Sequence, residues 1–241
     1  MGAGHHAHVV TAGAESKFGI HPAHIPELKK IAKKYGLRIT GLHQHIGSGG
    51  IFKASMLLKV VDSFLEVARQ FPDLEHIDFG GGFGVPYAPG EGRLPLIELG
   101  KKMHGRVKKF AHAYGRPIEM SFEPGRFVVA EAGVLLARVT DVKRNPQRTF
   151  IGVDSGMGHL IRPMMYGAYH EIENISHPHK KRERVTVAGY YCESGDVLAK
   201  DRLLPMPEIG DILAIKNAGA YGFVMSSDYN LRPKPREVML E

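Results

Sequence analysis

The first half of the chain alternates between short apolar runs that end in glycine and longer segments with a helical period. In residues 53–71 the apolar side chains fall on one helix face: Leu57, Val60, Val61, Phe64, Ala68 and Phe71. A strand-like run precedes this helix, "LRITGLHQHIGSGG", and another follows it, "HIDFGGGFG". A second helix is expected over residues 94–114, before a third strand-like run, "PIEMSFEPGR". This repeated order predicts a parallel α/β sheet or barrel.

After about residue 135 the pattern changes to short β-forming runs separated by proline and glycine. These runs are "VLLARVTDVKR", "TFIGVDSGM", "RERVTVAGYYCESGD" and "GDILAIKNAGAYG", and none of them contains a long helical period. The pattern therefore predicts an α/β domain over residues 1–134 and an all-β domain, a β-sandwich or Greek-key β-barrel, over residues 135–241.

Composition and charge narrow the classes of function. The net charge of +7 comes from clusters such as "KKIAKKYGLR" and "KKRER", which lack the interleaved aromatic residues of a nucleic-acid surface. We therefore expect anionic small molecules as ligands and no nucleic acid. No apolar run approaches the roughly 18 to 20 residues that cross a bilayer, and the first residues lack a signal-peptide pattern. One cysteine in 241 residues excludes an intrachain disulfide. Together these features predict a cytoplasmic protein without a membrane partner.

Three expected strand ends carry groups that suit a phosphate. In a β/α barrel the loops that follow the strands form the site. The run from Gly80 to Gly82 lets backbone N–H groups approach an anion, although a plain tight turn is the alternative. Val85 stands where a dinucleotide fingerprint needs its third glycine. Ser48 adds a hydroxyl, and Arg126 after Gly125 adds a cation, so the three ends together favour a phosphate-bearing ligand.

Two histidines, His43 and His45, point the same way from one expected strand. They could be core or turn residues, bind a metal, or stack on a flat ligand. A zinc hydrolase would need further ligands at the later strand ends, which carry glycine and "EPGR", so no metal site is expected. Glu123 favours the flat ligand, because a carboxylate beside a ring nitrogen would hold it protonated, as pyridoxal phosphate requires.

Cys192 stands in the sequence "YYCESGD", with acidic residues on its C-terminal side. Acidic neighbours favour the protonated thiol, which makes this cysteine a better proton donor than nucleophile. The simpler interpretation is a small, mostly buried apolar side chain.

Six segments carry a resemblance to a known family. In order, "HQHIGSGG", "HIDFGGGFG", "EPGR", "RPMMYGAYHEI", "YYCESGD" and "NAGAYG" resemble the diaminopimelate decarboxylases, which are alanine-racemase-like, fold type III pyridoxal-phosphate enzymes. The resemblance covers nearly the whole chain, and "CESGD" separates it from the eukaryotic ornithine decarboxylases. It implies a (β/α)8 barrel followed by a β domain, pyridoxal 5'-phosphate as cofactor, and decarboxylation of meso-2,6-diaminopimelate to L-lysine. It also implies a homodimer, in which the cysteine loop reaches the neighbouring subunit's active site.

The resemblance also implies a role for each site residue. His45 would stack on the pyridine ring, and Glu123 would pair with the ring nitrogen. Cys192 would return a proton to the substrate carbon after carbon dioxide leaves, and Glu193 would hold the distal amino group. The residues expected around the cofactor phosphate and its approach are Ser48, Gly81, Gly82, Gly125, Arg126 and Tyr221. Those expected at the distal carboxylate end of the substrate are Arg126, Arg162, Tyr166, Ser194 and Tyr221.

One departure from the family concerns its cofactor-bearing lysine, which lies in a Y-x-x-K-A type motif well upstream of the His-Gly-Ser strand. Only 42 residues precede His43, and none matches; Lys17 is the nearest early lysine. The sequence is therefore expected to be the C-terminal part of the enzyme, without decarboxylase activity on its own. Two alternatives stay open: a decarboxylase of lysine, ornithine or arginine, and a non-catalytic remnant that binds phosphate-bearing ligands.

Overall fold

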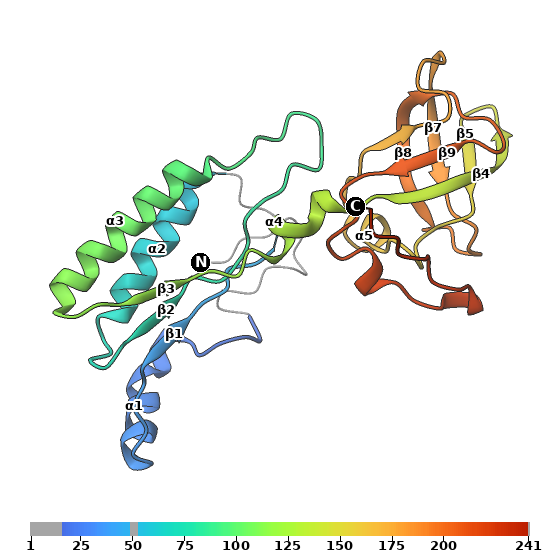
Figure 1. The fold of residues 1–241 in the computed structure, drawn as a ribbon. Helices are drawn as coiled ribbons and strands as arrows, with labels where there is room; N and C mark the ends of the chain where they lie inside the picture. The colour runs from blue at the N-terminus through green and yellow to red at the C-terminus, as the bar shows by residue number, and fades with distance from the viewer. Residues whose placement is uncertain (1–15, 49–52, 241) are drawn as a thin grey trace. The chain divides into compact units, whose positions relative to one another are not determined.

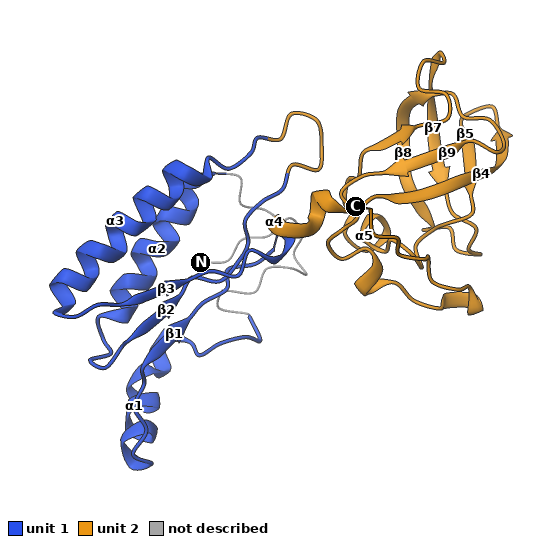
Figure 2. Cartoon of the chain, in the orientation of Figure 1, with its two compact units in different colours: residues 1–85, 92–126 blue, residues 86–91, 127–241 orange. Residues whose placement is uncertain are grey.

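The computed structural model describes residues 16–48 and 53–240, and these divide into two compact units (Figure 2). Unit 1 holds the described residues up to Val85 together with Gly92–Arg126, and unit 2 holds Pro86–Glu91 together with the described residues from Phe127 onward. The expected domain boundary, between residues 134 and 135, lies a little later in the chain than this division. The expected glycine turn at residues 49–50 and the first fifteen residues lie outside the described ranges.

Unit 1 is built on a three-stranded parallel sheet in the order β1-β2-β3 (Figure 1). The strands are β1 (Gly41–His43), β2 (His76–Asp78) and β3 (Glu119–Ser121). The helices are η2 (Pro22–His24), α1 (Ile25–Lys34), α2 (Ala54–Ala68) and α3 (Leu96–Tyr114), and α4 (Gly125–Val129) follows β3 across the division between the units. Because α2 joins β1 to β2 and α3 joins β2 to β3, the predicted β/α units are confirmed.

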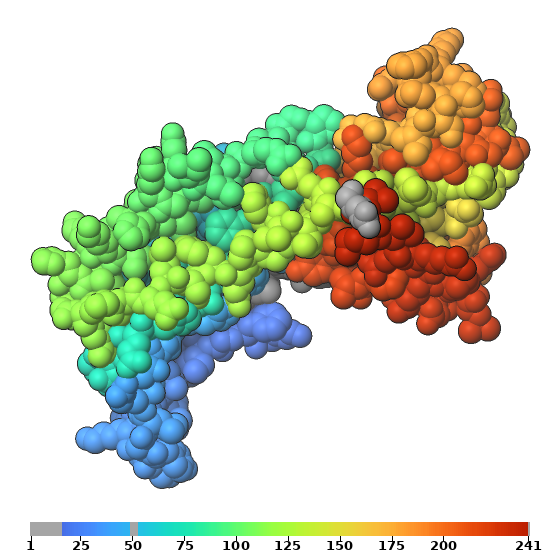
Figure 3. Space-filling view, viewed as in Figure 1, coloured from blue at the N-terminus to red at the C-terminus, as the bar shows by residue number. Residues whose placement is uncertain are grey.

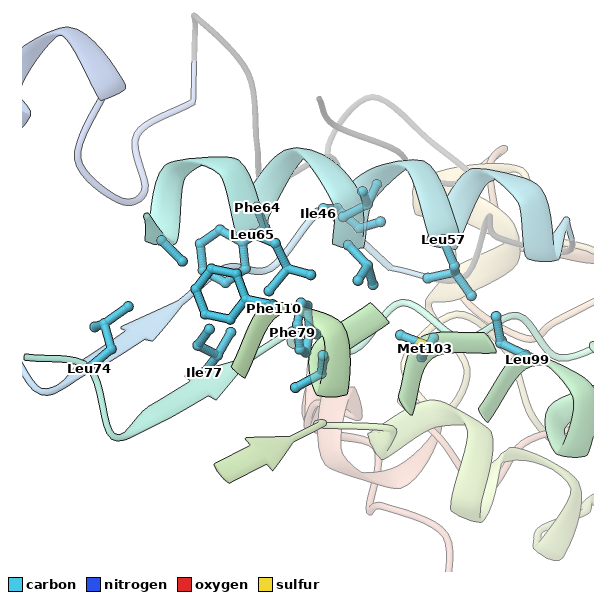
Figure 4. Close-up of a cluster of buried hydrophobic side chains, with 14 of the residues drawn as sticks. Ile46, Leu57, Phe64, Leu65, Leu74, Ile77, Phe79, Leu99, Met103 and Phe110 are labelled. Carbon is cyan, nitrogen blue, oxygen red and sulfur yellow. The ribbon is translucent and has the colours of Figure 1, made fainter. Parts of the chain in front are cut away.

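The core of unit 1 lies between this sheet and the adjacent helices α2 and α3 (Figure 4). The apolar face predicted for residues 53–71 is the buried face of α2, and α3 adds Leu99, Met103, Val107 and Phe110. Ile77 of β2 is fully buried, and Phe79 packs edge-on against Phe64 with 5.8 Å between ring centroids. Gly115 ends α3 with a φ of 85°, a left-handed conformation that suits glycine.

Unit 2 is a mixed sheet of six strands in the order β6-β9-β4-β5-β7-β8. The strands are β4 (Leu135–Arg144), β5 (Thr149–Val153), β6 (Ile172–Asn174), β7 (Arg182–Ala188), β8 (Val197–Pro205) and β9 (Ile212–Ile215). Neighbours pair antiparallel, except that β5 and β7 are parallel. The end strands β6 and β8 contact each other, so the sheet is nearly closed. The prediction that the second half of the chain is rich in β-strands is confirmed.

Short helices interrupt the β unit: η3 (Ala130–Ala132), α5 (Arg162–Tyr166), η4 (Phe223–Met225) and η5 (Tyr229–Leu231). Its core is formed by alternate side chains of the strands, including Ile151, Val185, Val187, Leu213 and Ile215. Strand β7 ends at Ala188, so "GYYCESGD" is a loop rather than the end of a strand. No helix in residues 16–48 and 53–240 is both long and apolar enough to span a bilayer.

Candidate functional site

The carboxyl ends of the three strands in unit 1 bring polar side chains together. His43, Asp78 and Ser121 are the last residues of β1, β2 and β3, and the parallel register places them side by side. Glu123 lies two residues beyond Ser121, so strand alternation directs it to the same side. Residues that are far apart in the sequence therefore meet at one edge of the sheet.

Both predicted histidines lie beside the Glu123 carboxylate. His43 Nε2 is 3.1 Å from Glu123 Oε2, and His45 Nδ1 is 3.8 Å from the same oxygen. The backbone N–H of Gly81 donates to His45 Nδ1 over 3.0 Å, so this nitrogen acts as an acceptor and its bond fixes the ring. Glu123 remains half exposed, and its Oε1 has no hydrogen bond to another described residue.

The glycine run packs tightly against the neighbouring strand ends. A Cβ at Gly80 would lie 2.2 Å from the Gln44 carbonyl oxygen, and one at Gly81 would lie 2.3 Å from that of Glu123. Gly80 also has a φ of 67°, and its N–H donates to Asp78 Oδ1 over 2.7 Å. Glycine is therefore needed at positions 80 and 81 for this close approach, whatever ligand the backbone then meets.

The strand ends also offer a set of possible metal ligands. His43, Asp78 and Glu123 each place a ligand atom within 4.8 Å of the others. The absence of a metal site was predicted because no further histidine or aspartate ligands were expected at the later strand ends, but Asp78 ends β2 and lies beside His43 and Glu123. A histidine with two carboxylates can hold a divalent cation.

The residues predicted at the phosphate occupy several places in the fold. Ser48 is half-buried after β1. Gly125 begins α4 and donates its N–H to the Glu123 carbonyl, while Arg126 is buried. Tyr221 belongs to unit 2, where it is exposed with a φ of 59°. Lys17 is exposed, and its Nζ lies 5.0 Å from the centre of the Phe18 ring.

In unit 2 a buried carboxylate anchors the cysteine loop between β7 and β8. Asp196 is 3% exposed and accepts the backbone N–H of Met157 over 2.6 Å and that of Tyr191 over 2.9 Å. A Cβ at Gly156 or Gly189 would lie within 2.6 Å of this carboxylate. Burial raises the pKa of Asp196 above its ordinary value, and the two amide hydrogen bonds act in the opposite direction. Asp196 is thus an internal anchor of the loop.

The tip of the same loop presents Cys192, Glu193 and Ser194 to solvent. The alternative of a buried apolar cysteine is therefore wrong for this chain. Asn230 Nδ2 donates to Cys192 Sγ over 3.2 Å, and the Tyr229 hydroxyl donates to Glu193 Oε1 over 2.5 Å. The bond to Glu193 raises the pKa of Tyr229 above its ordinary value. Neither Tyr229 nor Asn230 was predicted, since nothing periodic links them to the loop.

The short helix α5 carries two of the predicted substrate residues at its ends. Arg162 is 2% exposed, and its Nη1 donates to His170 Nε2 over 2.6 Å, while His170 Nδ1 donates to the Lys216 carbonyl over 2.8 Å. The guanidinium also lies 4.4 Å from the centre of the Tyr87 ring. Tyr166 is half-buried at the other end. Neither His170 nor Tyr87 was predicted, although the histidine lies within "RPMMYGAYHEI".

If Asp196 anchors the cysteine loop, Asp196→Ala should lower the free energy of unfolding by about 1 to 3 kcal/mol, because two buried N–H groups lose their acceptor. Asp154→Ala is the matched control: Asp154 is exposed and accepts one backbone N–H, from Arg138. Urea unfolding of the two variants measures the difference. Equal losses of stability in both would contradict the anchoring role.

Comparison of the chain with known proteins identifies its family. Residues 51–219 match the model for the pyridoxal-dependent decarboxylase C-terminal sheet domain. The chain is 44% identical over 248 residues to diaminopimelate decarboxylase of Methanothermobacter thermautotrophicus, covering 100% of this chain and 57% of that protein. It is 36% identical over 254 residues to the enzyme of the same name from Escherichia coli strain K12, covering 100% of this chain and 60% of the relative.

Solved structures agree with these sequence relatives. A crystal structure of diaminopimelate decarboxylase matches with a TM-score of 0.88 and 36% identity, over 97% of this chain and 58% of the other. The Helicobacter pylori enzyme in complex with L-lysine matches with a TM-score of 0.84 and 33% identity, over 95% and 56% of the two chains. The chain thus spans less than two thirds of the length of these relatives, and it belongs to the pyridoxal-dependent decarboxylase family.

Proposed function

We propose that this chain serves the pyridoxal-phosphate-dependent decarboxylation of meso-2,6-diaminopimelate to L-lysine. The observation that carries the proposal is the meeting of His45, Gly81 and Glu123 at the ends of three parallel strands. The names of the relatives support the reaction class, and the L-lysine bound to the Helicobacter pylori structure supports the product. A decarboxylase of lysine or ornithine is the competing assignment, and a Vibrio vulnificus lysine/ornithine decarboxylase matches with a TM-score of 0.78 and 25% identity.

The strand-end residues fit the proposed cofactor. His45 offers a flat ring that is held by the Gly81 N–H. Glu123 Oε1 has no hydrogen bond to another described residue, so it could accept one from a protonated ring nitrogen. When bound, pyridoxal phosphate supplies an electron sink for the charge left by the departing carboxylate. Glu123 would hold the proton on the ring nitrogen, and His45 would cover one face of the ring. The groups proposed around the phosphate are Ser48, Gly81, Gly82, Gly125, Arg126 and Tyr221.

The cysteine loop would supply the proton and read the substrate. Cys192 would donate its proton from Sγ to the substrate carbon after carbon dioxide leaves. The exposed Glu193 carboxylate would bind the distal ammonium group, and Ser194 would donate to the distal carboxylate. Arg162, oriented by His170 and Tyr87, and Tyr166 would bind that carboxylate from α5, together with Arg126 and Tyr221.

The wider assembly is proposed on the same family basis. The β/α units would form part of a (β/α)8 barrel, and two copies of the enzyme would share active sites through the cysteine loop. The parallel β/α order of unit 1 supports the barrel, and the exposure of Cys192, Glu193 and Ser194 supports their use in a shared site. A cytoplasmic location agrees with a biosynthetic role in making lysine.

Glu123→Gln should weaken binding of pyridoxal phosphate to the chain by about tenfold or more, because it removes a charge-assisted hydrogen bond worth at least about 1.4 kcal/mol. Glu98→Gln is the control, since Glu98 is an exposed residue of α3 in the same unit. Fluorescence titration with the cofactor measures both. If Glu123→Gln binds the cofactor as tightly as the parent, the proposed site is wrong.

Cys192→Ser should keep cofactor binding and lower carbon dioxide release by about 10²-fold or more, because a serine hydroxyl is a far weaker acid than a thiol. The assay uses the chain co-expressed with the part of the Methanothermobacter thermautotrophicus relative that lies outside the match. Diaminopimelate, lysine, ornithine and arginine are compared as substrates. Turnover near that of the parent would remove Cys192 from the reaction, and preference for lysine or ornithine would favour the competing assignment.

A further inference from the structure

The C-terminal segment of unit 2, residues 227–233, contacts the side chains of Cys192 and Glu193 in the cysteine loop. In Figure 3 this segment, coloured red, lies on the surface of the unit. Its helix η5 contributes the Asn230 amide to Cys192 Sγ and the Tyr229 hydroxyl to Glu193 Oε1. The partners in these two contacts are 38 and 36 residues apart in sequence, so the fold itself brings the segment to the loop.

The segment is fixed on both sides of η5. Before it, the Ser227 N–H donates to the Gly158 carbonyl over 2.8 Å. After it, His159 Nε2 donates to the Pro233 carbonyl over 3.0 Å, and the Arg232 guanidinium lies 4.5 Å from the centre of the Tyr190 ring. His159 is itself buried, and its Nδ1 accepts from the Ser155 hydroxyl over 3.1 Å. These contacts hold the chain on both sides of η5.

The backbone of η5 adopts an uncommon conformation at the contact. Asn230 has a φ of 54° and Leu231 a φ of 58°, so two successive residues other than glycine are left-handed. Asparagine tolerates this region better than most residues, whereas leucine does not. Leu231 is 94% exposed, so burial of its side chain does not account for the conformation. This turn places the side chains of Tyr229 and Asn230 against the same loop. Strained backbone of this kind is concentrated at functional sites.

We propose that Asn230 and Tyr229 are positioning residues, Asn230 for the Cys192 thiol and Tyr229 for the Glu193 carboxylate; the inference rests on the proposed function. An N–H that donates to sulfur stabilises the thiolate that remains once the proton has left, and it fixes the direction of Sγ. The Tyr229 hydroxyl occupies Oε1 of Glu193 and leaves Oε2, which has no other partner among the described residues, to meet the distal ammonium group.

The single cysteine of the chain gives a readout that does not depend on turnover, namely the rate of iodoacetamide alkylation as a function of pH. Asn230→Gly removes the amide and tolerates the left-handed backbone. Leu231→Gly is the matched control, because it makes the same change at the next left-handed position and keeps the amide. We expect Asn230→Gly to slow alkylation about fivefold at neutral pH, with an unchanged plateau at high pH, the size expected for the net contribution of one ordinary hydrogen bond. Leu231→Gly should stay within about twofold of the parent.

A pH profile of Asn230→Gly that matches the parent, or one that changes only at the plateau, overturns the role of Asn230. For Tyr229, the variant Tyr229→Phe should raise KM for diaminopimelate about fivefold in the co-expressed enzyme and leave kcat near the parent value. A change in kcat alone overturns that part. Failure of the proposed function is separate, because it would be seen as normal turnover of Cys192→Ser, whereas the alkylation profile is measured on the chain without substrate.

Discussion

A single buried carboxylate organises the reactive loop of the β unit. Asp196 bonds the backbone of Met157, ahead of α5, and that of Tyr191, directly before Cys192. Glycine at positions 156 and 189 leaves room for it. Both hydrogen bonds are buried and hold the loop backbone, and the exposed side chains of Cys192, Glu193 and Ser194 project from it. The proposed proton donor and substrate readers therefore depend on a buried residue that has no proposed contact with the substrate.

In unit 1, strand register and close backbone packing fix the positions of the candidate site residues. Parallel pairing aligns the ends of β1, β2 and β3, and the glycines after β2 let the three ends approach closely. Glu123 and His45 then share a short stretch of surface, and the Gly81 N–H fixes the imidazole. A flat ligand with one protonated ring nitrogen suits this arrangement, which is why pyridoxal phosphate is the proposed cofactor.

The sequence predicted the parts of this structure that periodicity or strand order determines. Helix α2 followed from its apolar face, and the meeting of His43, His45 and Glu123 followed from strand ends that lie at one edge. The exposure of Cys192 and the burial of Asp196 did not, because both depend on contacts with distant loops. Likewise, no local pattern links Arg162 to His170, or Asn230 to Cys192. Asp78 was not predicted as a possible metal ligand, because its place beside His43 depends on the register of β1 and β2.

In the proposed function, Glu123 would keep the ring nitrogen of bound pyridoxal phosphate protonated. Nitrogen-15 NMR of the complex with cofactor labelled at the ring nitrogen tests it most directly, because the chemical shift separates a pyridinium from a neutral pyridine. If Glu123 holds this proton, the parent chain should give a pyridinium shift and Glu123→Gln a neutral pyridine shift. A neutral shift in the parent, or a pyridinium shift that survives in Glu123→Gln, would contradict it.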